Sequence, residues 1–273
     1  MTHGFAVFCF CCFACVSLSQ AQVRSVFIED LTWEEVQNAM RSGVTIAIYY
    51  AGSTEQNGPH LALGKHNFVA RYVAQRIAET LGNALVYPIM PFAPTGDPLA
   101  RTGHMRFPGT VSISERLFGS VAREVALSAL VAGFKHVMLM GDHGDGQTAL
   151  KKTAAELDAA WATRGARVFY IGDVYGKTHE QVKAYLHQHH LPIGTHAGVS
   201  DTSEILFIDR DLKWIRPDKV APGDSTTGVD GDPRPASGKL GQMIVETKIT
   251  NAVTQIRTLL QQLPPATAPR PGR

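Results

Sequence analysis

Two short segments of this sequence concentrate side chains that bind metal ions or transfer protons. The first, residues 52–66, carries Glu55, Asn57 and His66. The second, residues 140–146, carries His143 and Asp145. Residues two apart in an extended chain point the same way, so Glu55 with Asn57, and His143 with Asp145, can face one cleft. Carboxylate, amide and imidazole groups together can hold a hard or borderline divalent cation.

Each segment also has a simpler interpretation. Residues 52–66 are equally compatible with a polar turn in which His66 begins a helix. Gly141, Gly144 and Gly146 suggest a phosphate-binding loop, but their spacing is not G-x-G-x-x-G and two acidic side chains in the loop would repel phosphate. The sequence has no Walker lysine motif and no G-x-S-x-G nucleophile elbow.

A third segment, residues 195–203, adds a histidine and a carboxylate. His196 lies in a glycine-containing loop, and Asp201 stands near the start of an expected helix. A loop histidine with a nearby carboxylate is a plausible proton shuttle. A purely structural histidine is the alternative, and the spacing does not decide between them.

Apolar patterns around these segments predict how they are positioned. Continuous apolar runs predict strands at 44–50, 84–90, 136–140 and 166–171. Three- and four-residue apolar spacing predicts helices at 67–81, 112–130 with Ser112 as the cap, 147–162, 177–188 and 246–263. This alternation predicts an α/β fold, with a mostly parallel central sheet flanked by helices on both faces. Sites in such folds follow the carboxyl ends of strands, which selects residues 51–66 and 141–146.

Composition and charge narrow the class of protein. The chain has 273 residues, a net charge of +2 and no basic block, so we expect neither nucleic acid nor an anionic membrane surface as a partner. All four cysteines lie within the first 15 residues. We interpret residues 1–21 as a signal peptide cut after Ala21; lipid attachment at Cys15 or a mis-assigned start are the alternatives.

Cleavage there would leave a cysteine-free protein, periplasmic or secreted and not membrane-bound. Any metal ion would then be held by histidine, carboxylate, amide or water ligands. We expect one hydrolase domain over 22–263 and a disordered proline-rich tail over 264–273.

The three segments together resemble the creatininase (creatinine amidohydrolase) family. Its pattern G-S-x-E-Q-H-G-P-H-L-P-L-x-x-D compares with Gly-Ser-Thr-Glu-Gln-Asn-Gly-Pro-His-Leu-Ala-Leu-Gly-Lys-His over 52–66. The pattern H-A-G-x-x-E-T-S compares with His-Ala-Gly-Val-Ser-Asp-Thr-Ser over 196–203. Residues 141–145, 104–110 and 228–233 match further motifs, in family order.

The resemblance implies a three-layer α/β sandwich, hydrolysis of a cyclic or linear amide, two zinc or manganese ions and a homo-oligomer, often a hexamer. By position, Glu55 and His143 would bind one ion and Asp145 the other, and His196 would be the catalytic histidine. His60 and His104 lie near the site in this family, which makes them candidates for substrate binding; a structural role is the alternative for both.

Two positions depart from the family pattern. His66 stands where an aspartate normally bridges both ions, and Asn57 stands where a histidine normally binds the second ion. A carboxylate can bridge two ions, whereas a neutral imidazole offers one lone pair. We therefore predict one tight divalent ion held by Glu55, His66 and His143, with a second ion weak or absent.

The expected reaction is hydrolysis of a small-molecule amide by metal-activated water. Asp145 would position or deprotonate the water, and His196 would stabilise the oxyanion or protonate the leaving nitrogen. Asp201 would orient His196 or cap its helix. Creatinine itself is doubtful, because no tryptophan lies near His196 in the sequence; a formamide, a lactam or a peptide-like amide are alternatives. The altered ligands also leave open an inactive periplasmic metal- or ligand-binding protein.

Overall fold

A computed structural model describes residues 24–224 and 226–264 of the chain. The predicted signal peptide and residues 265–273 of the predicted tail lie outside these described residues. No helix among the described residues is long and apolar enough to cross a membrane.

The centre of the molecule is a four-stranded sheet in the order β2-β1-β3-β4, and every strand pairing is parallel. The strands are β1 (Ile46–Ala51), β2 (Ala84–Val86), β3 (His136–Gly141) and β4 (Arg167–Tyr170). All of β1 is buried, including Tyr49 and Tyr50, as expected of a strand covered on both faces. The predicted α/β fold with a parallel sheet is confirmed.

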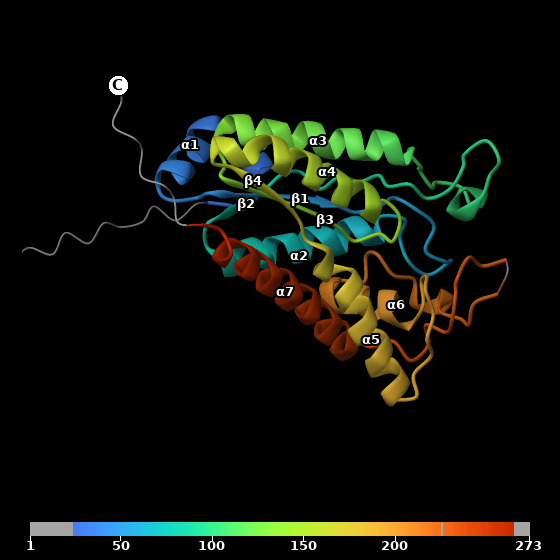
Figure 1. Ribbon diagram of the computed structural model, residues 1–273. Helices are drawn as coiled ribbons and strands as arrows, with labels where there is room; N and C mark the ends of the chain where they lie inside the picture. The colour runs from blue at the N-terminus through green and yellow to red at the C-terminus, as the bar shows by residue number, and fades with distance from the viewer. Residues whose placement is uncertain (1–23, 225, 265–273) are drawn as a thin grey trace, which may run out of the picture.

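Helices cover both faces of this sheet (Figure 1). One face carries α2 (Lys65–Leu81) and α7 (Gly238–Gln261); the other carries α1 (Trp33–Arg41), α3 (Glu115–Ala132) and α4 (Gln147–Trp161). Two further helices, α5 (Gly176–Gln188) and α6 (Val199–Ile208), lie beyond the carboxyl ends of the strands. Short 3-10 helices occupy Ile28–Asp30, Gly103–Arg106, Ala162–Arg164, Gly172–Val174 and Pro217–Lys219.

The apolar spacing within the helices explains their attachment to the sheet. Val69, Val73 and Ile77 form the buried stripe of α2, and Phe118 and Ala122 belong to the buried stripe of α3. The two stripes belong to separate cores on opposite faces of the sheet. Full burial of one large aliphatic or aromatic side chain contributes about 1.5–3 kcal/mol, so these cores hold the three layers together.

Several element boundaries differ from the sequence expectations. The helix predicted from Ser112 begins at Glu115, because Ser114 provides the cap by accepting from the Leu117 N–H at 3.2 Å. Ser112 is therefore not a cap, and its hydroxyl instead donates to the Gly96 carbonyl at 2.6 Å. The strand predicted over 84–90 is shorter, since Pro88 has no N–H to offer a neighbouring strand.

The first and last helices also differ from the sequence expectations. Helix α1 was not predicted; a capping box between Thr32 and Glu35 begins it. Helix α7 begins at Gly238, eight residues before the predicted start, with Ser237 as its cap. Glycines at 238 and 241 weakened the helical signal there.

The strand order places the two polar segments next to each other. In the pairing of β1 with β3, Ala51 lies opposite Gly141. The loop after β1 and the loop after β3 therefore leave the sheet side by side. The helices that follow them, α2 and α4, lie on opposite faces of the sheet. Ligand sites of open α/β sheets form at this topological switch point.

Gly241 is the residue that allows α6 and α7 to pack together. A Cβ atom at this position would lie 1.8 Å from the Ser203 carbonyl oxygen and 2.4 Å from its carbon, both backbone atoms. We expect Gly241→Ala to lower the free energy of unfolding by about 2–3 kcal/mol or more, because the two helices must separate. Urea unfolding followed by circular dichroism measures this change.

Gly176 in α5 provides a matched control, since a Cβ there would meet nothing within 4 Å. Gly176→Ala should leave the free energy of unfolding unchanged or raise it by up to about 1 kcal/mol, because alanine favours helix. Equal effects of the two substitutions would contradict the packing argument.

Candidate metal centre and cavity

Glu55 is the central group of the site. It follows β1 in a loop fixed by its own N–H, which donates to the Leu63 carbonyl at 3.0 Å, and Ser53 donates its hydroxyl to Glu55 Oε2 at 2.8 Å. The side chain is fully buried. Burial alone would raise the pKa of Glu55, but contacts with the His143 and His66 rings hold it well below its ordinary value. Glu55 is therefore a buried carboxylate anion.

His66, in the first turn of α2, is held by a second carboxylate. Its Nδ1 donates to Asp142 Oδ2 at 2.8 Å, because a carboxylate only accepts. Its Nε2 lies 3.1 Å from Glu55 Oε1 and 2.8 Å from Lys65 Nζ. Burial and the Lys65 ammonium act to lower the pKa of His66, but the hydrogen bonds to Asp142 and Glu55 outweigh them and raise it. Because Nδ1 donates to Asp142, Nε2 is the His66 atom that could bind a metal ion.

His143 reaches Glu55 from the loop after β3. Its Nε2 lies 2.9 Å from Glu55 Oε2, opposite the side approached by His66, and the two imidazole rings meet edge to face at 5.2 Å. The Asp145 N–H donates to His143 Nδ1 at 3.2 Å, and the Gln147 amide donates to the His143 carbonyl at 2.6 Å. The loop thus holds the ring through Nδ1, and Gln147 holds the backbone of His143.

Glu55, His66 and His143 fit a divalent metal ion. One ligand atom from each lies within 4.8 Å of the others, and all three residues are buried. Two imidazoles and one carboxylate are the donor set of many zinc and other transition-metal sites. The Asp142 carboxylate behind His66 adds the partner that orients a ligating histidine in such sites. A second grouping, Glu55 with His104 and His196, shares the same carboxylate.

Behind His66 lies a network of buried charges that the sequence analysis did not identify. Lys248, from α7, lies 2.6 Å from both Asp142 Oδ1 and Glu204 Oε1. Burial acts to raise the pKa of Asp142, but Lys248 and His66 outweigh it and lower the pKa. Burial raises the pKa of Glu204. Lys248 therefore fixes the carboxylate that fixes His66.

His196 faces the same carboxylate from the opposite wall. Its Nε2 donates to the Gln56 carbonyl at 2.8 Å, and its Nδ1 lies 3.8 Å from Glu55 Oε1. Burial, reinforced by the nearby Lys65 ammonium, lowers the pKa of His196 to about 4. His196 is therefore neutral near pH 7, with the Nδ1 lone pair toward the centre. The His104 ring lies beside it, with centroids 4.2 Å apart.

The backbone next to His196 is strained and held by hydrogen bonds. Ala197 has a φ of 52°, in the left-handed region that non-glycine residues rarely adopt. Its N–H donates to Asp201 Oδ2 at 2.6 Å, and the His196 carbonyl accepts from the Asp230 N–H at 2.8 Å. Asp201 thus positions the His196 loop through the backbone rather than through the His196 ring.

Asn57 and His60 lie behind the site. Asn57 is buried and donates its side-chain amide to the Glu55 carbonyl at 2.9 Å; its Oδ1 has no hydrogen-bond partner among the described residues. His60 is buried with Nε2 2.9 Å from the Thr202 hydroxyl. Neither residue lines the cavity described next. Their predicted roles as a ligand and a substrate contact stay predictions.

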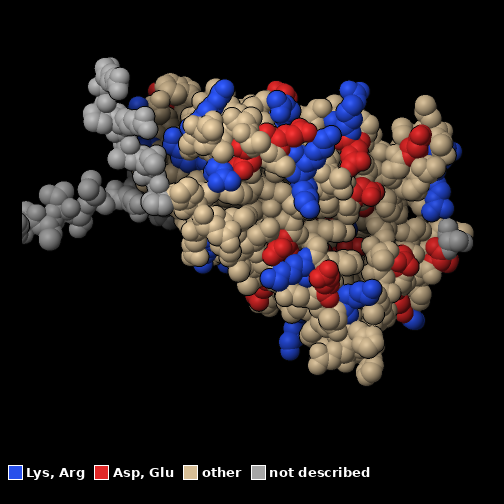
Figure 2. All heavy atoms as spheres, in the orientation of Figure 1, with Lys and Arg blue, Asp and Glu red and all other residues tan. Residues whose placement is uncertain are grey.

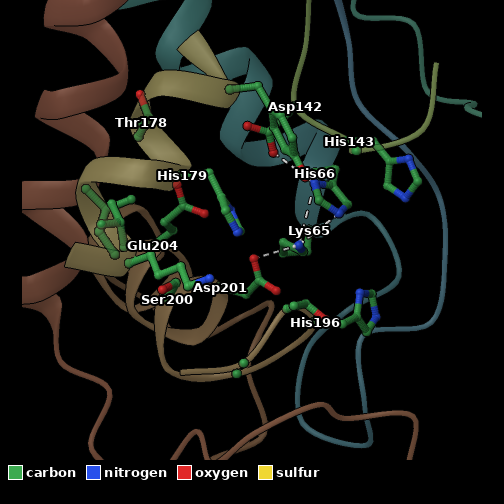
Figure 3. A pocket seen from close by; sticks show the side chains of 18 of the residues that line it. Lys65, His66, Asp142, His143, Thr178, His179, His196, Ser200, Asp201 and Glu204 are labelled. Atoms are coloured by element: carbon green, nitrogen blue, oxygen red, sulfur yellow. Dashed lines mark hydrogen bonds and ion pairs between the residues drawn. The ribbon is translucent and has the colours of Figure 1, made fainter. Parts of the chain in front are cut away.

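A cavity of about 470 Å³ opens beside these groups. It is lined by His66, His143, His104, His196 and the exposed Asp145, and also by the aliphatic side chains of Val182, Leu186, Ile193 and Ile244. Figure 3 shows Lys65, Asp142, Asp201 and Glu204 around this cavity. On the surface, basic and acidic side chains are interspersed, and the visible face is hollowed below α4 (Figure 2).

The site residues that sequence reasoning missed are Asp142, Lys65, Lys248 and Glu204. Lys65 stands inside the first segment but was passed over for its neighbour His66. Lys248 and Glu204 carried a signal: each is a charged residue among apolar positions of a helix, Lys248 between Val245 and Ala252. A charge on the buried stripe of a helix indicates a partner inside the protein.

Comparisons with known proteins agree with this geometry. The family model "Creatininase: Creatinine amidohydrolase" matches residues 29–256. A solved creatinine amidohydrolase (creatininase) superposes with a TM-score of 0.71 at 21% identity, covering 88% of this chain and 100% of that one.

Two curated relatives match parts of the chain. A creatinine amidohydrolase of Pseudomonas putida is 27% identical over 120 residues, 44% of this chain and 45% of that protein. A mycofactocin precursor peptide peptidase of Mycolicibacterium smegmatis is 33% identical over 132 residues, 45% of this chain and 51% of that protein. The matched regions thus span about half of each relative. With a family model matching most of its length, this chain belongs to the creatininase family.

Proposed function

We propose that this protein is a metal-dependent hydrolase that cleaves an amide C–N bond with a metal-activated water. The observation that carries the proposal is the convergence of Glu55, His66 and His143 beside a cavity that His66, His143 and His196 line. The peptidase and creatinine amidohydrolase relatives both cleave amide bonds by name, which supports the same reaction class.

The ligands favour a single tightly held ion, zinc or manganese. Solved creatininases include a form described as Zn-Zn and one described as Mn. In this chain His66 commits Nδ1 to Asp142 and so offers one lone pair. Asn57 does not line the cavity, and Asp145 is exposed. A second, weaker ion would have to share the Glu55 carboxylate with the first and use His104 and His196 as its other ligands.

Each residue around the centre has a separate role in the proposed hydrolysis. A bound divalent ion lowers the pKa of its water to about 7 and polarises a carbonyl. His196, neutral and with its Nδ1 lone pair toward Glu55, can accept a proton from water and return it to the leaving nitrogen. Asp145, at the exposed edge of the cavity, can orient the water. Asp201 holds the His196 loop in place.

The cavity favours an amide with an aliphatic portion over a small planar ring. Four aliphatic side chains line it, and none of the three tryptophans does. A peptide-like amide suits this shape, in line with the peptidase relative. His104, beside His196, is placed to contact the substrate end nearest the centre.

We also propose that the protein is exported after cleavage at Ala21 and acts in the periplasm or outside the cell as a homo-oligomer. The apolar N-terminal run supports export, and family membership supports an oligomer. N-terminal sequencing of the protein from cell fractions and its mass in solution test these two points separately.

Removal of the metal should abolish turnover. In a screen of peptide-like amides, formamides and lactams, we expect hydrolysis that a chelator stops and zinc or manganese restores. His143→Ala should lose both the ion and at least about 10³-fold of the activity, because a ligand and its charge contacts disappear.

Exposed His187 at the end of α5 provides the control, and His187→Ala should behave as the wild type. Full activity without metal would contradict the proposed metal-dependent reaction. Tight metal binding without turnover on any amide would instead favour an inactive binding protein on the same fold.

Metal analysis tests the single-ion proposal directly. The purified protein, after dialysis against metal-free buffer, should retain about one divalent ion per chain. His66→Asp restores a carboxylate that can bridge two ions, so its retained metal should rise above one per chain. Two tightly held ions in the wild type would refute the single-ion proposal.

Asp142 should affect metal affinity without touching the ion. Asp142→Asn removes the charged acceptor of His66 Nδ1, so we expect metal affinity to fall about 10–100-fold, measured by calorimetric titration. Asp158, paired with Arg167 at 2.7 Å, provides the control for a lost ion pair elsewhere. Asp158→Asn should lower stability but leave affinity unchanged; equal loss of affinity in both variants would assign the effect to general destabilisation.

A further inference from the structure

Helix α5 presents one continuous face to the cavity. Thr178, His179, Val182, Lys183 and Leu186 line it, and their spacing of three and four residues is that of a single helical face. Val182 and Leu186 are buried, whereas His179 and Lys183 are exposed. Figure 3 shows the His179 ring pointing into the cavity. This face therefore combines an apolar stripe with two nitrogen donors, and neither donor has a role in the proposed hydrolysis.

Lys183 differs from the other lysines of the cavity wall in its charge partners. Lys65 and Lys248 are paired with carboxylates at 3.0 and 2.6 Å, whereas Lys183 forms no ion pair with any residue that the structure describes. Lys177, on α5 but outside the cavity, pairs with Asp173 at 3.8 Å. An ammonium that lines a cavity without such a partner can bind an anionic group of a ligand through a charge-assisted hydrogen bond.

Ile193 adds an exposed apolar surface to the same cavity. It lies in the loop between α5 and α6, and 45% of this large aliphatic residue is exposed. The chain turns back at His190, and the Leu191 N–H donates to the Leu186 carbonyl at 2.9 Å, which brings the loop onto the end of α5. Apolar side chains in a concave site favour an apolar group of the ligand.

Hydrogen bonds and a close backbone contact hold the Ile193 loop in place. The Thr195 N–H and hydroxyl both donate to Asp230 Oδ2, at 2.8 and 2.6 Å. A Cβ atom at Gly194 would lie 2.0 Å from the Asp230 carbonyl oxygen, so glycine is needed for this approach. Ile193 is therefore in position before a ligand arrives, which reduces the entropy that binding costs.

The positions of these groups favour an extended ligand. Tyr175, directly before α5, lies against the loop after β3, since a Cβ atom at Gly144 would lie 2.9 Å from its hydroxyl. Lys183 follows eight residues later, about 12 Å further along the helix axis. Ile193 is three residues from His196, which is at most roughly 11 Å of extended chain. A ligand that reaches from the centre to Lys183 therefore spans about two or three extended residues.

We propose that His179, Lys183 and Ile193 form a substrate subsite for a carboxylate beside an aliphatic side chain, as at the C-terminal leucine or valine of a peptide. This inference rests on the proposed amide hydrolysis and names its substrate class. The carboxylate accepts hydrogen bonds from the Lys183 ammonium and the His179 ring, and the aliphatic side chain packs on Ile193 and Val182. A phosphate suits the cavity less well, because four carboxylate residues line it and oppose a second negative charge.

Peptides that differ only at their C-terminal residue test the subsite. With zinc or manganese supplied, the full chain should hydrolyse acetylated glycyl-glycyl-leucine with a kcat/KM about 5-fold above that of its C-terminal amide, the upper range for an exposed charge pair. It should prefer this peptide about 10-fold over the one that ends in glycine, because part of one aliphatic side chain becomes buried. Mass spectrometry of the products measures both ratios.

Lys183→Met tests the carboxylate contact. Loss of the ammonium should reduce the preference for the free acid over the amide from about 5-fold to less than about 2-fold, and Lys183→Glu should reverse it. Lys177→Met is the matched control, because Lys177 lies on the same helix outside the cavity; it should keep the wild-type preference. An unchanged preference for the free acid in Lys183→Met overturns the proposal.

Ile193→Ser tests the aliphatic contact. It should reduce the preference for leucine over glycine from about 10-fold to about 3-fold, because the apolar surface that the leucine covers becomes polar. Val131→Ser provides the control, since Val131 is exposed on α3 and does not line the cavity. An unchanged preference for leucine in Ile193→Ser overturns the subsite as proposed. Ile193 and Lys183 are both exposed, so neither substitution removes a core contact.

Ligand binding without turnover separates this inference from the function it rests on. Saturation-transfer NMR with the full chain compares acetyl-leucine with acetyl-leucinamide. If the wild type hydrolyses no amide, the proposed function fails, yet tighter binding of acetyl-leucine that Lys183→Met loses and Lys177→Met keeps still supports the subsite. Equal binding of the two ligands by the wild type overturns the subsite, even where amide hydrolysis is found.

Discussion

The structure depends on positive groups that neutralise the negative charge of carboxylates gathered at the carboxyl edge of the sheet. Glu55, Asp142, Asp201 and Glu204 come from three parts of the chain; the last three line one cavity, and the buried Glu55 contacts two of the histidines that line it. A buried charge without a partner costs several kcal/mol, so each of these groups requires a cation or a proton. Two lysines and two imidazoles meet this requirement among the described residues. The same groups make the centre suitable for a metal ion, because they hold their orientation before any ligand arrives.

Two separate packing contacts of the fold bring these carboxylates to their positively charged partners. Pairing of β1 with β3 brings Glu55 beside His143. The close approach of α6 and α7, which only glycine at position 241 permits, brings Glu204 to Lys248. Asp142 belongs to both, because it contacts His66 through one oxygen and Lys248 through the other. Packing far from the cavity therefore determines how rigidly a metal ligand is held.

The sequence predicted the sheet well because the strands are buried on both faces and carry an unmistakable apolar signal. It also predicted which loops form the centre, since parallel strands bring their carboxyl ends to one edge. It missed Lys248 and Lys65 because propensity reasoning assigns lysine to the surface, and only tertiary contacts show that both are buried. Boundaries such as the start of α3 were displaced because Ser112 and Ser114 are equally suitable caps, and the choice depends on a loop contact of Ser112 with Gly96.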